Sequence, residues 1–252
     1  MNIVLSKRMQ MNVDMIDTGS KVADIGCDHG FVSIYLIENN IAQRVLAMDV
    51  ATGPLERAKE HVHEAGVEDN IDIRLSDGLS AVKVDENGVP EVDTVLIAGM
   101  GGRLAMHIVE EGIDKIRKMK ALILQAQSDI SYVRERLYQL QLYIVDENMV
   151  CEDGKYYTVI KAVPAHLYDG DKYEEYSLTE LQYGRILINR KATVLKEYLN
   201  FCRSNYEGIV ADINRHLAND SDCDNVSEST VNSKNRMEKS IFEIDRILAN
   251  MG

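Results

Sequence analysis

Aspartate and glycine alternate in the segment 22–30, Val-Ala-Asp-Ile-Gly-Cys-Asp-His-Gly. The segment opens with an apolar run typical of a buried strand, and a second apolar run ends at Asp49. In a strand–turn–helix–strand unit, glycine lets the backbone approach a ligand, and an acid at the second strand end accepts hydrogen bonds from ribose hydroxyls. The pattern therefore predicts a nucleoside site. We assign to it Asp24, Gly26, Cys27, Asp28, His29, Gly30, Asp49 and Val50.

The acid within this turn discriminates between nucleoside cofactors. Dinucleotide enzymes favour the spacing Gly-x-Gly-x-x-Gly, because a pyrophosphate must sit on the helix N-terminus. Here Asp28 occupies the turn, where it would repel a phosphate and favour a cation or an ammonium group. S-adenosylmethionine carries a ribose, a sulfonium and an ammonium group but no phosphate, so the loop favours this cofactor over NAD. An ordinary turn that binds nothing is the alternative for this motif alone.

Two further strand ends carry residues of the same kind. Asp77-Gly78 follows the strand-like run 71–75, and its carboxylate is suited to an adenine amino group, although a simple turn also explains the pair. The run 95–98 leads into Gly99-Met100-Gly101-Gly102, which holds more glycine than a strand-to-helix crossover needs. Ligands of open α/β sheets bind outside the carboxyl ends of the strands. We therefore add Asp77, Gly78, Ala98, Gly99 and Met100 to the cofactor site.

A sheet with covering helices is needed to bring these loops together. We predict strands near 21–25, 45–49, 71–75, 94–98 and 121–125. We predict a helix or helix pair at 2–16 and helices at 30–39, 53–65, 103–118 and 130–140. Two closing strands follow at 142–151 and 155–163, joined by the turn Glu152-Asp153-Gly154.

The tail changes character after Pro164. A polar linker, 164–177, precedes two stretches in which apolar or small residues recur at steps of three and four, and 218–229 breaks them with turn formers. This spacing predicts a coiled-coil-like antiparallel hairpin. We therefore expect two domains, 1–163 and 164–252. The two seams are Ala192, Leu195, Leu199, Cys202, Tyr206, Ile209 and Ile213, and Met237, Ile241, Ile244, Leu248 and Met251.

The motifs together resemble class I S-adenosylmethionine-dependent methyltransferases and, more narrowly, the bacterial tRNA (adenine-22-N1)-methyltransferase family. The resemblance covers roughly residues 1–163. The matching segments are 5–8, 23–29, 53–54, 71–75 with 77–79, 97–102, 122–125, and 152–155 before Tyr157. The chain departs from the family in carrying Gln125-Ala126-Gln127 where Gln-Pro-Asn is common, and Asp49 where many members have Glu.

The resemblance implies a Rossmann-like class I methyltransferase sheet of the α/β class, closed by an antiparallel hairpin that dinucleotide-binding sheets lack. It also implies methyl transfer from S-adenosylmethionine to N1 of an adenine in tRNA, at position 22. Adenine N1 is a neutral lone-pair nucleophile at pH 7, so catalysis needs mainly positioning rather than a strong base. Near the target base we place Met100, Gly101, Gln125, Gln127 and His29.

The charge of the chain restricts how it can hold RNA. A formal net charge of −13 is the opposite of what a non-specific phosphate binder carries, so RNA contacts must be local. A solvated helix face is the alternative for each basic cluster. The candidate RNA-binding residues are Lys7, Arg8, Arg103, Lys115, Arg117, Lys118, Arg190 and Lys191.

Composition favours a cytoplasmic protein without a membrane span or a metal. The chain has no long apolar run and no signal-peptide pattern, and its four cysteines have no metal-site spacing. We expect a monomer or a weak dimer. Two other functions stay open: a methyltransferase that acts on a small molecule or protein and uses its tail to dimerise, and a nucleoside-binding protein without catalysis.

Overall fold

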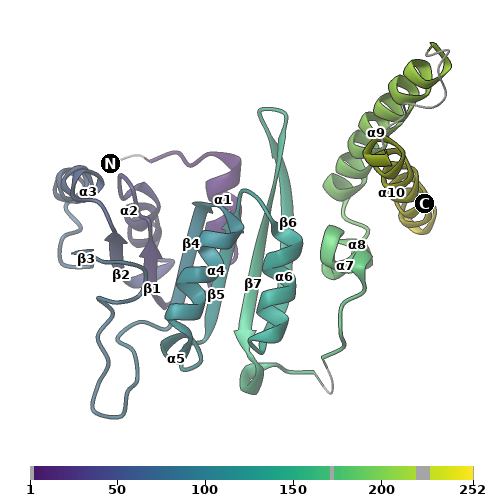
Figure 1. The fold of residues 1–252 in the computed structure, drawn as a ribbon. Coiled ribbons are helices and arrows are strands. Elements are labelled where there is room, and N and C mark those ends of the chain that lie inside the picture. Colours follow the sequence, from purple (N-terminus) through teal and green to yellow (C-terminus); the bar gives the residue numbers. More distant parts are fainter. Residues whose placement is uncertain (1–2, 171–172, 220–227, 252) are drawn as a thin grey trace. The chain divides into compact units, whose positions relative to one another are not determined.

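The computed structural model describes residues 3–170, 173–219 and 228–251. The chain forms two compact units, Met1–Gln182 and Tyr183–Gly252. The first unit holds a seven-stranded sheet (Figure 1). Its strands are β1 (Ser20–Ile25), β2 (Ala42–Asp49), β3 (Ile71–Leu75), β4 (Thr94–Met100), β5 (Ala121–Ala126), β6 (Leu142–Glu152) and β7 (Lys155–Pro164). Its helices are α1 (Lys7–Val13), α2 (Phe31–Glu38), α3 (Thr52–Ala65), α4 (Gly102–Glu111), α5 (Ile113–Ile116), α6 (Ile130–Gln139), the 3-10 helix η1 (Ala165–Leu167) and α7 (Leu178–Tyr183).

The sheet joins five parallel strands to an antiparallel hairpin, in the order β3-β2-β1-β4-β5-β7-β6. Helices α1, α2 and α3 cover one face, and α4, α5 and α6 cover the other (Figure 1). A parallel sheet covered on both faces needs apolar side chains in both directions, which is why its strands read as continuous apolar runs. The strand order reverses between β1 and β4, so the ligand crevice of such a sheet lies outside their carboxyl ends. The predicted fold class is confirmed.

Two predicted helices differ from those in the structure. The first, expected over 2–16, is helical only in α1. The second, expected over 103–118, is divided at Gly112 into α4 and α5. A side chain at Gly112 would meet Leu79, whose Cβ lies 3.2 Å from the place that a Cβ on Gly112 would take. The close packing of the segment after β3 therefore explains the glycine, and local periodicity does not reveal it.

The segment after β7 belongs to the first unit. The hydroxyl of Tyr173 accepts from the backbone amide of Ile144 at 2.9 Å, and the Tyr173 ring stacks on Tyr143 of edge strand β6 at 4.0 Å between centroids. At the end of the segment, buried Arg134 donates to the carbonyls of Leu181 and Gln182 at 2.7 and 3.2 Å. The two compact units therefore divide after residue 182, whereas the composition of the linker suggests a division after 163.

The second unit is a helical hairpin. It contains α8 (Arg185–Asn189), α9 (Thr193–Asn219) and α10 (Glu228–Met251), and α9 packs against α10. All members of both predicted seams are buried or half-buried except Ile209, whose neighbour Val210 is half-buried; Ala192 precedes the first residue of α9. Most of the predicted break, 218–229, lies outside the described residues. None of the helices that the structure describes is long and apolar enough to cross a membrane.

Candidate active site

The loop between β1 and α2 is shaped by glycine and tied to β2. Gly26 and Gly30 have φ angles of +74° and +75°, a region that residues with a side chain rarely adopt. The backbone amides of Gly26 and Cys27 donate to the carbonyl of Met48 at 2.8 and 3.0 Å. Asp28 takes φ +48°, and its side chain is exposed. The loop therefore presents its backbone and one carboxylate beside the end of β2.

Asp24 supports this loop from inside. Its side chain is buried and accepts a hydrogen bond from the Ser33 hydroxyl of α2 at 2.7 Å. Burial raises the pKa of Asp24 to about 6; the Ser33 bond acts to lower it, and the nearby charge of Asp49 adds to the rise. Asp24 thus braces the loop against α2, and Ser33 is a partner that the sequence motif does not point to.

Asp49 at the end of β2 keeps a carboxylate oxygen available. Its Oδ1 accepts from the backbone amide of Ala51 at 2.9 Å, and within the described residues Oδ2 has no hydrogen-bond partner. The neighbouring Val50 is 71% exposed and Leu75 at the end of β3 is 58% exposed. An acceptor for ribose hydroxyls therefore lies beside an apolar surface that suits a flat base.

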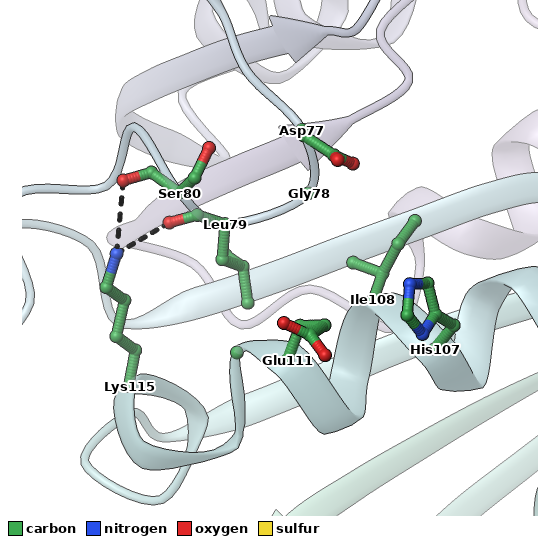
Figure 2. Close-up of a pocket in the computed structure, with 9 residues that line it drawn as sticks. Asp77, Gly78, Leu79, Ser80, His107, Ile108, Glu111 and Lys115 are labelled. Atoms are coloured by element: carbon green, nitrogen blue, oxygen red, sulfur yellow. Dashed lines mark hydrogen bonds between the residues drawn. The ribbon is translucent and has the colours of Figure 1, made fainter.

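Asp77 and Gly78 line a cavity of about 230 Å³ between the segment after β3 and helix α4 (Figure 2). Gly78 has φ +51°, and a Cβ placed on it would lie 3.1 Å from Ile108 of α4. The opposite wall carries His107 and Glu111, which are both exposed. Asp77 therefore borders open space, as a contact to a ligand requires.

The glycine loop after β4 packs between the loop after β1 and the loop after β5. Gly99 has φ +78° and forms a bulge in the pairing of β4 with β5. The amide of Gln127 donates to the carbonyl of Met100 at 2.8 Å, and the end of the Met100 side chain lies against Gly26. A Cβ on Gly102 would collide with the Ser128 carbonyl. The loops after β1, β4 and β5 therefore form one packed rim.

The predicted base-contacting side chains differ in how accessible they are. Gln125 is 1% exposed; its Nε2 donates to the Ala126 carbonyl at 3.2 Å, and its buried Oε1 has no hydrogen-bond partner within the described residues. Gln127 is exposed, beside Gly99. The half-buried His29 stacks near Phe31 at 5.7 Å between ring centroids. Gln127 and His29 are therefore accessible to a substrate base, whereas Gln125 supports the rim from inside.

Cys27 is unsuited to nucleophilic catalysis. Its side chain is buried, and burial together with the charges of Asp24 and Asp49 raises the pKa of the thiol above its usual range. A reactive cysteine needs the thiolate form, which these acids disfavour. Cys27 is thus a small packing residue of the loop. No cluster of three or more His, Cys, Asp or Glu side chains suited to a metal ion occurs in the described parts of the chain.

Cations of the basic cluster at 115–118 are held by backbone carbonyls, and Lys115 lines the cavity that Asp77 borders. The Lys115 ammonium donates to the carbonyls of Leu79 and Val82 at 2.7 and 2.8 Å, and Lys118 donates to that of Gly88 at 3.0 Å (Figure 2 shows Lys115). Arg117 points a donor at the Leu140 carbonyl at 3.5 Å. These cations precede β5, so they lie toward the amino ends of the strands. Both lysines donate to carbonyls of the protein itself, and the assignment of this cluster to RNA stays a prediction.

The other candidate cations lie on different elements. Lys7 is exposed at the start of α1, and Arg8 beside it is half-buried. Arg103 is exposed on α4 and lies over the Tyr132 ring at 4.8 Å. In the second unit, Arg190 and Lys191 are exposed directly after α8.

The side chains at the carboxyl edge of the sheet fit S-adenosylmethionine. Asp49 offers an unpaired oxygen for a ribose, Val50 offers an exposed apolar surface, and the acidic Asp28 occupies the turn where a phosphate would need positive partners. At Gly26 the end of the Met100 side chain occupies the place that a Cβ would take, so this loop packs directly on the glycine loop after β4. The cofactor residues predicted from the sequence are thus brought to one edge of the sheet.

Comparison with known proteins agrees with this geometry. A methyltransferase-domain profile matches residues 5–160, and the fold and the site define a class I S-adenosylmethionine-dependent methyltransferase. The chain is 35% identical over 213 residues to the tRNA (adenine(22)-N(1))-methyltransferase of Bacillus subtilis (strain 168), which covers 81% of this chain and 85% of the relative. The chain belongs to the tRNA (adenine(22)-N(1))-methyltransferase family.

Solved structures resemble both units. The B. subtilis m1A22 tRNA methyltransferase TrmK has a TM-score of 0.78 at 29% identity, covering 98% of this chain and 100% of that one. M. capricolum TrmK, in complex with the natural cofactor product S-adenosyl-homocysteine, has a TM-score of 0.75 at 25% identity, covering 97% and 100%. The likeness therefore includes the helical tail.

Proposed function

We propose that this protein transfers a methyl group from S-adenosylmethionine to N1 of an adenine in tRNA, at position 22. The observation that carries the proposal is the 35% identity to the B. subtilis enzyme over four-fifths of the chain, a span long enough to include the whole crevice. The structure of M. capricolum TrmK in complex with S-adenosyl-homocysteine supports the cofactor.

Different residues of the crevice bind different parts of S-adenosylmethionine. Asp49 accepts from the ribose hydroxyls, Val50 and Leu75 contact the adenine of the cofactor, and Asp77 accepts from its amino group. The backbone of Gly26 and the carboxylate of Asp28 face the amino-acid end, where an acid favours an ammonium group. The buried Asp24 side chain stabilises the loop through its hydrogen bond with Ser33 and does not enter the crevice.

The methyl-transfer step does not require the protein to accept or donate a proton. S-adenosylmethionine, when bound, supplies an electrophilic methyl group on a sulfonium. The lone pair of adenine N1 forms the new bond to carbon as the carbon–sulfur bond breaks, so the base gains the positive charge and the sulfur becomes a neutral thioether. No proton leaves in this step, which fits a rim that offers Gln127 and His29 as orienting groups rather than a strong base.

N1 is paired in a duplex, so the target adenine must be unpaired or turned outward. Within the glycine loop 99–102, a flat base has room to approach the backbone at Gly99, where Gln127 and Arg8 lie 3.8 and 4.0 Å from the place of a Cβ. We infer that the second unit, with Arg190 and Lys191, adds contacts to the tRNA. Action in the cytoplasm and the oligomeric state stay predictions.

The test is methyl transfer to defined RNA. Purified protein is incubated with methyl-labelled S-adenosylmethionine and unmodified bacterial tRNA, and the digested nucleosides are separated. We expect label in 1-methyladenosine, and none when adenine 22 is replaced by guanine. Label on another base, on ribose, or only on a protein or small molecule would contradict the proposed substrate while leaving the cofactor assignment intact.

A further inference from the structure

Arg8 occupies an unusual position among the arginines of the first unit. It lies in the first turn of α1, a helix that Ser6 caps by accepting from the amide of Met9 at 3.3 Å. Its guanidinium carbon lies 5.1 Å from the centre of the Tyr157 ring on β7, a distance typical of a cation–π contact. The cap and the ring together hold the guanidinium in one place.

That place is the rim of the glycine loop. A guanidinium nitrogen of Arg8 lies 4.0 Å from the point that a Cβ on Gly99 would occupy, and Nε2 of Gln127 lies 3.8 Å from the same point. Residues from the N-terminus, from β4 and from the segment after β5 therefore converge where the target base must enter. Nothing in the spacing of these residues along the chain shows this convergence.

The guanidinium of Arg8 has no acceptor in the described residues. Two other arginines of the unit have carboxylate partners: Arg134 bonds Glu147 at 2.7 Å, and Arg136 bonds Glu110 at 2.7 Å. Glu152 is near Arg8, but its carboxylate faces the Arg8 backbone amide at 3.4 Å. A guanidinium carries five donors in a planar fork that matches an anion with two oxygens.

We propose that Arg8 is a substrate-binding residue that grips a phosphate of the RNA backbone next to the methylated adenine, with Tyr157 as the positioning residue that fixes its guanidinium. The inference rests on the proposed function, because it takes the tRNA as the anion. The proposal assigns one particular phosphate to Arg8, whereas a general basic patch would attract the RNA without a specific contact.

The cofactor carboxylate is the other anion within reach of Arg8, because Gly99 lies on β4 and only β1 separates that strand from β2, which Asp49 ends. The Tyr157 contact, however, is on β7, on the side of β4 that faces away from Asp49. We therefore assign the RNA phosphate to Arg8, and the affinity of the Arg8 variants for S-adenosylmethionine separates the two anions.

The experiment compares Arg8→Ala and Arg8→Lys with the wild-type protein. For Arg8→Ala we expect the tRNA dissociation constant to rise about ten- to a hundredfold and S-adenosylmethionine affinity to stay within about twofold. The slope of log affinity against log salt should fall by about one, as for one lost phosphate contact. Lysine keeps the charge but not the fork, so Arg8→Lys should keep the salt slope and lose only part of the affinity.

A matched control removes the same charge elsewhere. Arg44→Ala changes an exposed arginine near the amino end of β2, at the opposite edge of the sheet, and should leave both affinities unchanged. Weaker S-adenosylmethionine binding by Arg8→Ala would assign the residue to the cofactor instead. Unchanged tRNA binding, in a variant that binds cofactor normally, would reduce Arg8 to a packing partner of Tyr157. Either result leaves the proposed function standing if the wild-type protein makes 1-methyladenosine.

Discussion

Carboxylates at the carboxyl edge of this sheet do different work because they differ in burial. Asp24 is enclosed and bonded to Ser33, so it stabilises the loop, whereas Asp49 keeps one oxygen accessible to a ligand. The alternating motif predicts both as cofactor residues, because sequence spacing does not report whether a side chain is enclosed. Burial separates a structural acid from a binding acid.

Replacing Asp49 by alanine should weaken S-adenosylmethionine binding about ten- to a hundredfold. The reason is the loss of hydrogen bonds to a charged acceptor, each worth about 1.5–3 kcal/mol. Calorimetric titration measures this change. Asp49→Glu keeps the acceptor and should stay close to wild type, and an Asp49→Ala protein that is folded and binds normally would show that the acid lies outside the site.

Asp24→Asn should stabilise the cofactor-free protein, and more at neutral than at acidic pH. The folded-state pKa of about 6 exceeds the ordinary 3.8, so between these values the folded state binds more protons than the unfolded state. Wild-type stability therefore falls as pH rises from about 4 to 6, and the loss is complete above that range. Asparagine does not ionise and can still accept from Ser33.

Urea denaturation at several pH values measures this difference. The free energy of unfolding of Asp24→Asn relative to wild type should rise by about 2.4 kcal/mol between pH 4 and pH 7.5. A difference that does not vary with pH would mean that burial does not perturb this carboxyl group.

At the scale of elements, the site depends on loops that touch rather than on single strands. The glycine loop after β4 packs against the start of the segment after β5, and the Met100 side chain spans from it to Gly26. The sequence shows that glycines are needed there, but not what each one approaches. Gly102 illustrates this, because it has no positive φ, and its neighbours are what exclude a side chain.

Gly102→Ala should lower kcat/KM for tRNA on the order of ten- to a hundredfold. The new Cβ would meet the Ser128 carbonyl and the Val133 side chain, so the loop must shift, and small displacements of positioning groups reduce rates strongly. Gly53→Ala is the matched control, because no atom lies within 4 Å of a Cβ at that helical position. Equal activities of the two variants would show that the loop geometry is not critical.

At the scale of the whole molecule, the C-terminal end of the first unit supplies hydrogen-bond acceptors to a buried arginine. Arg134 and Glu147 form a buried ion pair, and the arginine also needs the carbonyls at the end of α7. Those carbonyls come from residues 181 and 182, so a chain cut at 163 would leave buried donors unpaired, which is costly. The linker is therefore part of the first unit.

A chain ending at Gln182 should fold, keep most of its S-adenosylmethionine affinity and lose tRNA binding. The crevice lies wholly within the first unit, while the acidic catalytic unit is expected to need the tail for its hold on RNA. Circular dichroism, calorimetry and gel-shift titration measure the three properties. A chain ending at Val163 should be less stable than the longer one, and full methylation by the 1–182 protein would exclude an RNA-binding role for the tail.

The amino-acid sequence alone determined the strands, the glycine turns, the acid at residue 49 and the helical hairpin, because each is encoded by neighbours a few residues apart. Spacing of three and four, apolar runs and turn residues are local signals. Tertiary structure alone decided that Ser33 meets Asp24, that Arg8 reaches Gly99, and that the Leu79 carbonyl holds Lys115. Those outcomes depend on strand order and on packing between distant segments, which set which side chains meet but leave no trace in local spacing.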